Sequence, residues 1–136
     1  MTDGLSYVLD ASALLAHLNN EKGADAVEGA LVRGSAMSSV NLAEVLTRLA
    51  RLGEEPASIF RSLQAQGLFG GRLSILAVTE GDAVAIAQLE AKTRAAGLSL
   101  GDRACLALAR RLGLPAMTAD RAWTRLKVGV VVEVIR

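Results

Sequence analysis

The sequence is poor in aromatic residues, cysteine and histidine, and each scarcity excludes a kind of structure or chemistry. Phe, Trp and Tyr make up 3% of the 136 residues, so Ala, Leu and Val must fill the core. The single cysteine, Cys105, cannot form an internal disulfide and is expected to be a buried structural thiol. The only histidine, His17, is expected on the surface or in packing, and it rules out two histidines working as acid and base within one chain.

Long apolar runs are also missing. No stretch reaches the roughly 18 residues that a membrane span needs, and residues 1–4 lack the basic start and apolar run of a signal peptide. We therefore expect a soluble cytoplasmic protein that makes no membrane contact. Hydrophobic residues nevertheless make up 51% of the chain, which predicts one globular domain over residues 1–136. The mean hydropathy of +0.35 is high and indicates apolar surface covered by a partner.

The charge balance is nearly even, with a net charge of +1 from 15 basic and 14 acidic residues. This balance gives no sign of a polyanion-binding protein. If four of the acids gather in one pocket, however, the remaining surface is basic. Most of the basic residues are arginines, which suit phosphate recognition. The composition is thus compatible with a nucleic-acid ligand without requiring one.

Hydrophobic patterning predicts alternating strands and helices, which favours a three-layer α/β sandwich with a central, mostly parallel sheet flanked by helices. Thr79 and Asp82 form an acidic variant of a capping box at the start of a long helix that ends near Gly97. Ser12 is the expected N-cap of the first helix. The expected strands are 6–9, 35–38, 73–76, 116–118 and 128–135. The other expected helices are 11–20, 23–32, 41–52, 56–66 and 101–112.

Four acidic residues are candidates for a functional site, and two of them lie just after expected strands. Asp10 and Asp120 follow expected strands, and ligands in open α/β sheets bind beyond the carboxyl ends of the strands. Asp102 opens a helix, and Glu44 lies early in the helix that begins at Asn41. Structural roles are open alternatives, because the three aspartates could cap helices and Glu44 could pair with Arg48 at i+4.

The local sequences around these acids resemble the PIN-domain ribonucleases, and most closely the VapC-type toxins of bacterial toxin–antitoxin pairs. The resemblance covers nearly the whole chain and rests on four blocks in the same order and spacing. The blocks are Tyr7-Val8-Leu9-Asp10-Ala11-Ser12-Ala13, Asn41-Leu42-Ala43-Glu44-Val45, Leu98-Ser99-Leu100-Gly101-Asp102 and Thr118-Ala119-Asp120-Arg121-Ala122-Trp123. The last block lacks the further acid that some family members carry, which leaves the number of metal ions open.

The resemblance implies that Asp10, Glu44, Asp102 and Asp120 form a catalytic quartet that binds Mg²⁺ or Mn²⁺. Two carboxylates about 4 Å apart repel by roughly 4 kcal/mol at an effective dielectric constant near 20, and a divalent cation with oxygen ligands relieves this repulsion. Ser12 and Thr118 match the hydroxyl residues that support such acids. Arg103 could contact RNA phosphate, or equally form a surface ion pair, and Trp123 is expected to pack in the core.

The function implied is a metal-dependent endoribonuclease that hydrolyses RNA by in-line attack of water. The implied partners are the RNA substrate, a cognate antitoxin and a second copy of the chain in a homodimer. Two alternatives keep the fold, namely an RNA-processing PIN nuclease outside any toxin pair and a non-catalytic PIN-like binding module. A phosphotransferase that uses Asp10 as its nucleophile would need a second aspartate where Ser12 stands.

Overall fold

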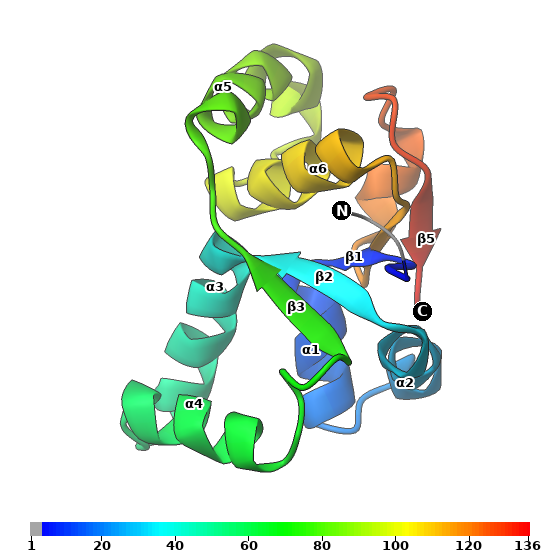
Figure 1. The fold of residues 1–136 in the computed structure, drawn as a ribbon. Coiled ribbons are helices and arrows are strands. Elements are labelled where there is room, and N and C mark those ends of the chain that lie inside the picture. The colour runs from blue at the N-terminus through cyan, green and yellow to red at the C-terminus, as the bar shows by residue number, and fades with distance from the viewer. Residues whose placement is uncertain (1–3) are drawn as a thin grey trace.

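A computed structural model describes residues 4–136, and its secondary structure alternates between short strands and helices (Figure 1). The elements in the first half are β1 (Val8–Leu9), α1 (Ala11–Leu18), α2 (Ala24–Arg33), β2 (Ser35–Ser38), α3 (Ser39–Ala50) and α4 (Pro56–Ala65). The elements in the second half are β3 (Leu73–Leu76), α5 (Glu80–Thr93), η1 (Arg94–Ala96), α6 (Leu100–Leu112), β4 (Ala116–Thr118), η2 (Arg121–Arg125) and β5 (Val132–Val134). The segments η1 and η2 are 3₁₀ helices.

The strands form one sheet in the order β3-β2-β1-β4-β5, and all four strand pairs are parallel. Successive side chains along a strand face opposite sides of the sheet. Val8 packs with the core on the α5–α6 side, and Leu9 packs with the core on the α1–α4 side. Helices thus cover both faces of the sheet (Figure 1), which confirms the predicted three-layer sandwich.

Local sequence signals account for most of the element boundaries. Thr79 and Asp82 form the predicted capping box at the start of α5. Pro56 occupies the first turn of α4, where a missing N–H costs no hydrogen bond. The structure corrects the expected cap of α1, because Asp10 is the N-cap and accepts from the Ala13 N–H. Ser12 lies inside the helix instead.

The prediction that residues 128–135 form one strand is wrong in length. β5 contains only Val132–Val134, because its sole neighbour β4 is three residues long and offers three partners. Gly129 adopts a left-handed φ of 75°, which turns the chain away from an extended path just before the strand. Val128 is buried in the core on the α5–α6 side of the sheet.

No helix among residues 4–136 is long and apolar enough to cross a membrane. The interior is built largely from aliphatic side chains, and Trp123 of η2 is the largest side chain that is fully buried. Its burial confirms the expected packing role. Its indole N–H has no hydrogen-bond partner among residues 4–136.

Replacing Trp123 by alanine is expected to lower the free energy of unfolding by about 3–5 kcal/mol, because it leaves a large cavity against α6. Trp123→Phe retains an aromatic ring and removes the unpaired indole N–H, so its loss is expected to be clearly smaller. Urea denaturation of the two variants measures both effects. Equal losses for alanine and phenylalanine would contradict this account of the packing.

Candidate functional site

The carboxyl ends of β1 and β4 lie at the point where the strand order reverses. From β1 the chain runs outward to β2 and β3, and then returns to place β4 on the other side of β1. Such a switch point is where open α/β sheets bind ligands. Asp10 directly follows β1, and Asp120 lies two residues beyond β4. Because α6 leads into the amino end of β4, it starts at the carboxyl edge of the sheet and brings Asp102 there.

Asp10 is buried, with 4% of its surface exposed, and its carboxylate accepts three hydrogen bonds. Oδ1 accepts from the Ser12 hydroxyl at 2.7 Å and from the Ala13 N–H at 2.8 Å. Oδ2 accepts from the Thr118 hydroxyl at 2.6 Å. Burial raises the pKa of Asp10 to about 6, the hydrogen bonds oppose that rise, and the negative charge of Asp102 adds to it.

The hydroxyls of Ser12 and Thr118 connect Asp10 to β4, which lies beside β1 in the sheet. Each hydroxyl donates its one proton to Asp10. The two hydroxyl oxygens lie 3.4 Å apart and have no proton left for a hydrogen bond to each other. Each oxygen also accepts a backbone N–H, from Ala119 to Ser12 at 2.9 Å and from Asp120 to Thr118 at 3.1 Å. The buried carboxylate is therefore fixed by donors from both α1 and β4.

Glu44 lies on α3 but is directed at the start of α6. The Asn41 side-chain N–H₂ group donates to Glu44 Oε1 at 2.8 Å and to the Gly101 carbonyl at 3.0 Å. Both amide protons of this buried asparagine are thus used to join the two helices. The alternative i+4 ion pair with Arg48 does not form among residues 4–136, because the Glu44 carboxylate is held by Asn41 instead.

Gly101 leaves room for the Glu44 carboxylate. A Cβ atom built on Gly101 would lie 2.5 Å from the Glu44 carboxyl carbon, a distance that requires one of the two to move. Any side chain at position 101 would therefore displace Glu44 from its place beside α6. Glycine is required here by close approach, although it weakens the helix by about 1 kcal/mol relative to alanine.

Asp102 and Glu44 belong to the same electrostatic neighbourhood as Asp10. Burial raises the pKa of the Cys105 thiol well above its usual value, and the charges of Asp10, Asp102 and Glu44 each raise it further. The negative charges of all three carboxylates therefore contribute to the high pKa of Cys105. Cys105 itself is the inert, fully buried thiol that the sequence predicts.

Asp120 lies at the outer end of this group and is exposed to solvent. It caps η2 by accepting the Ala122 N–H on Oδ1 at 2.9 Å. Over residues 4–136, no three Asp, Glu, His or Cys side chains are close enough together to form a ready metal cluster. The structure thus holds Asp10 near enough to Asp102 for its charge to add to the rise that burial causes in the Asp10 pKa. It also places the Glu44 carboxylate beside the start of α6, next to Asp102, and sets Asp120 at the same edge of the sheet.

The capping roles considered for the aspartates are confirmed, yet they leave acceptor oxygens available. Asp102 Oδ2 accepts the Ser99 N–H at 2.9 Å in a capping box, while Oδ1 has no partner among residues 4–136. The same holds for Oδ2 of Asp120 and Oε2 of Glu44 within the described chain. An all-oxygen donor set with free lone pairs fits Mg²⁺ or Mn²⁺. The buried Asn41 Oδ1 adds one more unpaired oxygen.

Arg103, the suggested RNA contact, donates from Nη1 to the Ile86 carbonyl at 2.9 Å and so ties α6 to α5. Its half-buried guanidinium still has donors to spare, and contact with RNA stays a prediction. His17 is half-buried, with Nε2 3.6 Å from a Glu28 carboxylate oxygen, in keeping with the expected surface or packing role.

Sequence reasoning missed Asn41 and Gly101, which together set the position of Glu44. Their functions depend on a contact between residues 60 positions apart, which no local pattern reveals. The available signals were a polar residue one turn before Glu44 and a glycine directly before Asp102. Both are ordinary at helix starts, so neither would have been singled out without the fold.

Comparison with known proteins identifies the family. The family model described as "PIN domain" matches residues 7–129, and the chain therefore belongs to the PIN domain family. A search of curated proteins gave no match.

Solved structures share this fold at low sequence identity. The DNA-bound VapBC structure from Salmonella typhimurium aligns with a TM-score of 0.70 and 20% identity, covering 97% of this chain and 99% of that one. A toxin–antitoxin complex from Klebsiella pneumoniae aligns with a TM-score of 0.71 and 17% identity, covering 96% of this chain and 98% of that one. FitAcB from Neisseria gonorrhoeae aligns with a TM-score of 0.69 and 19% identity, covering 93% of this chain and 95% of that one. These likenesses show the fold.

Replacing Gly101 by alanine is expected to displace the Glu44 carboxylate without destabilising the fold, because the clash is with the end of a flexible side chain. Stability should change little, because the gain of up to about 1 kcal/mol from helix propensity opposes the loss of the Asn41–Glu44 hydrogen bond. The rise in melting temperature on adding Mn²⁺ should shrink to that of Glu44→Gln.

Gly29→Ala is the matched control, since Gly29 lies in α2 and an added methyl group there would meet no other atom within 4 Å. It should gain helix stability and keep the full response to Mn²⁺. An undiminished Mn²⁺ response in Gly101→Ala would show that Glu44 does not act from the place the structure gives it.

Asp10→Asn is expected to change the pH dependence of stability. Because the pKa of Asp10 is raised on folding, from 3.8 to about 6, the wild type loses stability as the pH rises through that interval. Neutral asparagine removes this loss, so between pH 4 and pH 8 without metal its stability relative to wild type should rise by roughly 2–3 kcal/mol. Thermal unfolding across this range in EDTA measures the difference. Parallel pH profiles would disprove the burial effect.

Proposed function

We propose that this chain is a metal-dependent endoribonuclease and the toxin of a toxin–antitoxin pair that acts in the cytoplasm. The observation that carries the proposal is the position of the buried Asp10 carboxylate at the sheet's switch point, where burial and the nearby negative charge of Asp102 raise its pKa. Such a concentration of negative charge is costly without a cation. A protein that maintains it at a ligand-binding edge is equipped to hold one.

The proposed ligands of Mg²⁺ or Mn²⁺ are Asp10, Glu44, Asp102 and Asp120. When bound, the cation supplies Lewis-acid polarisation of a phosphodiester and charge neutralisation. The chain's own residues supply the positioning. Ser12 and Thr118 hold Asp10 through their hydroxyl protons, and Asn41 holds Glu44 against Gly101.

The reaction proposed is hydrolysis by in-line attack of water on phosphorus. A bond forms between the water oxygen and phosphorus while the bond to the leaving ribose oxygen breaks, and the proton that water loses is balanced by the proton that the leaving oxygen gains as it becomes a hydroxyl. The fixed carboxylates orient the reacting groups, which is how most of the rate enhancement of phosphoryl transfer arises. No covalent bond between enzyme and phosphate is needed.

The toxin assignment is supported by size and by surface. The alignments cover 98–99% of the matched chains in the VapBC structure and the Klebsiella toxin–antitoxin complex. This chain therefore has the length expected of such a toxin. Several large apolar side chains are exposed, and they offer surfaces for a cognate antitoxin and for a homodimer. They are Val32, Leu52, Val84, Leu100 and Val131.

Cleavage of single-stranded RNA with Mg²⁺, with Mn²⁺ and with EDTA tests the proposed activity. Wild type should cleave only with metal, and Asp10→Asn and Asp102→Asn should each lower the rate at least 100-fold, because each removes a charged ligand. Glu80→Gln is the control, since Glu80 is exposed at the start of α5 and should cleave like wild type. Metal-independent cleavage, or full activity in both Asp variants, would sink the proposal.

A further inference from the structure

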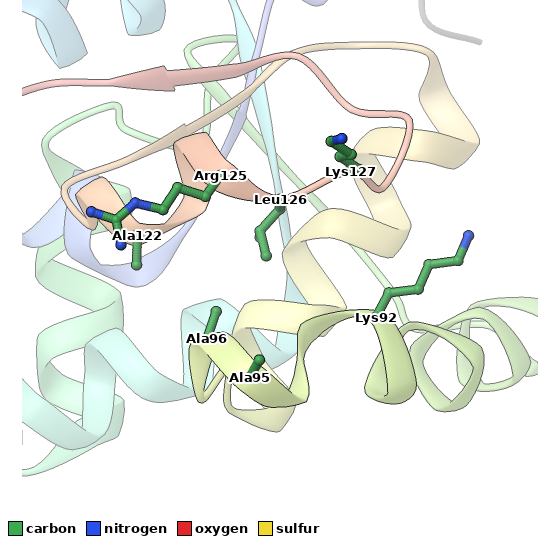
Figure 2. A pocket seen from close by; sticks show the side chains of 7 residues that line it. All are labelled: Lys92, Ala95, Ala96, Ala122, Arg125, Leu126 and Lys127. Atoms are coloured by element: carbon green, nitrogen blue, oxygen red, sulfur yellow. The ribbon is translucent and has the colours of Figure 1, made fainter.

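A cavity is formed by residues of two segments that also carry proposed metal ligands, and nothing in the proposed catalysis uses it. It is open to solvent, has a volume of about 540 Å³ and is lined by Lys92, Ala95, Ala96, Ala122, Arg125, Leu126 and Lys127. Figure 2 shows the alanines on opposite walls, with the long basic side chains extending around the opening. The cavity is formed between the end of α5 with η1 and the segment that includes η2.

The two walls belong to the segments that carry two of the proposed metal ligands. Ala95 and Ala96 belong to η1, which runs directly into the start of α6 and Asp102. Ala122 lies two residues after Asp120 and donates its N–H to that carboxylate. The cavity is therefore connected through short stretches of backbone to the carboxyl edge of the sheet.

The charge of the lining is positive and unbalanced. Lys92, Arg125 and Lys127 line the cavity with no acidic residue among its lining. None of these three side chains forms an ion pair within residues 4–136, whereas Arg94 nearby is paired with Glu90 at 2.7 Å. Two of the chain's three lysines are gathered here. Such free cations attract a polyanion.

The rest of the lining is small and apolar. Three alanines and Leu126 leave flat surface between the cations, against which a ribose or the face of a base can lie. Single-stranded nucleic acids are bound in this way, by basic side chains along the phosphates and apolar surface under the bases. An acidic peptide would use the cations but would gain little from a shallow alanine floor.

We propose that this cavity, here called the basic cavity, binds the phosphates of the RNA strand next to the cleaved bond. The inference rests on the proposed ribonuclease function and assigns its substrate path. It also resolves an electrostatic difficulty, because four carboxylates at the catalytic edge repel an approaching polyanion. Three cations on adjoining segments offset this repulsion and fix the direction in which the strand leaves the site.

The test is RNA binding by the triple variant Lys92→Gln/Arg125→Gln/Lys127→Gln. Fluorescence anisotropy with a labelled 12-nucleotide single-stranded RNA, in EDTA to prevent cleavage, gives the Kd at several salt concentrations. The variant should bind at least 10-fold more weakly than wild type. The slope of log Kd against log salt should fall by about 2, since each lost phosphate contact on a single strand removes about 0.7.

The matched control is Lys22→Gln/Arg33→Gln/Arg61→Gln, which removes the same charge from exposed positions next to or within α2 and α4. It should keep wild-type affinity and nearly the wild-type slope. Melting temperatures of both variants verify folding. With Mg²⁺, the triple variant at the basic cavity should show a raised KM on the 12-mer with kcat largely retained, because its catalytic carboxylates are intact.

The outcomes separate this inference from the proposed function. If wild type cleaves RNA and the triple variant binds it with unchanged Kd and slope, the basic cavity is not the RNA path, while the nuclease stands. If the triple variant instead loses binding to poly-L-glutamate and keeps RNA binding, the cavity takes an acidic peptide and the inference is overturned. If wild type neither binds nor cleaves RNA, the proposed function fails and the inference falls with it.

Discussion

The burial of a single carboxylate, that of Asp10, is the constraint on which the site depends. Removing a carboxylate from water is expensive unless its oxygens accept hydrogen bonds. Asp10 receives them from Ser12, Ala13 and Thr118, and those donors connect β1, the first turn of α1 and β4. The same interactions that offset the desolvation therefore fix the switch point of the sheet. Even so, the pKa of Asp10 is raised, so part of the cost is not compensated.

A second polar connection extends this arrangement across the molecule. Asn41 uses both amide protons to hold Glu44 and the Gly101 carbonyl, so α3 and α6 are joined near the carboxyl edge of the sheet. The missing side chain at Gly101 is what lets the carboxylate lie against the start of α6. Neither residue carries charge or chemistry of its own. Their contribution is to place a carboxylate that would otherwise extend into solvent from its helix.

Structural and functional roles coincide in the aspartates. Asp10, Asp102 and Asp120 each cap a helix or a 3₁₀ helix through one oxygen, and two of them keep the other oxygen free of partners among residues 4–136. Capping restricts the carboxylate without consuming all its lone pairs, which is a suitable starting point for binding a cation. In the proposed function, the positive charge that attracts RNA comes from the basic cavity on neighbouring segments rather than from the acids themselves.

The sequence by itself determined whatever depends on neighbouring residues: the α/β alternation, the capping box at Thr79 and Asp82, and strand-end positions for Asp10 and Asp120. Glu44 entered only through family resemblance, because its own helix pattern indicated an exposed ion pair with Arg48. Tertiary structure decided its true direction, the need for Gly101, the shortness of β5 and the meeting of η1 with η2 around the basic cavity. These features depend on contacts between residues far apart in the chain. Turn, cap and periodicity signals act over a few residues, so they do not encode which distant side chains meet.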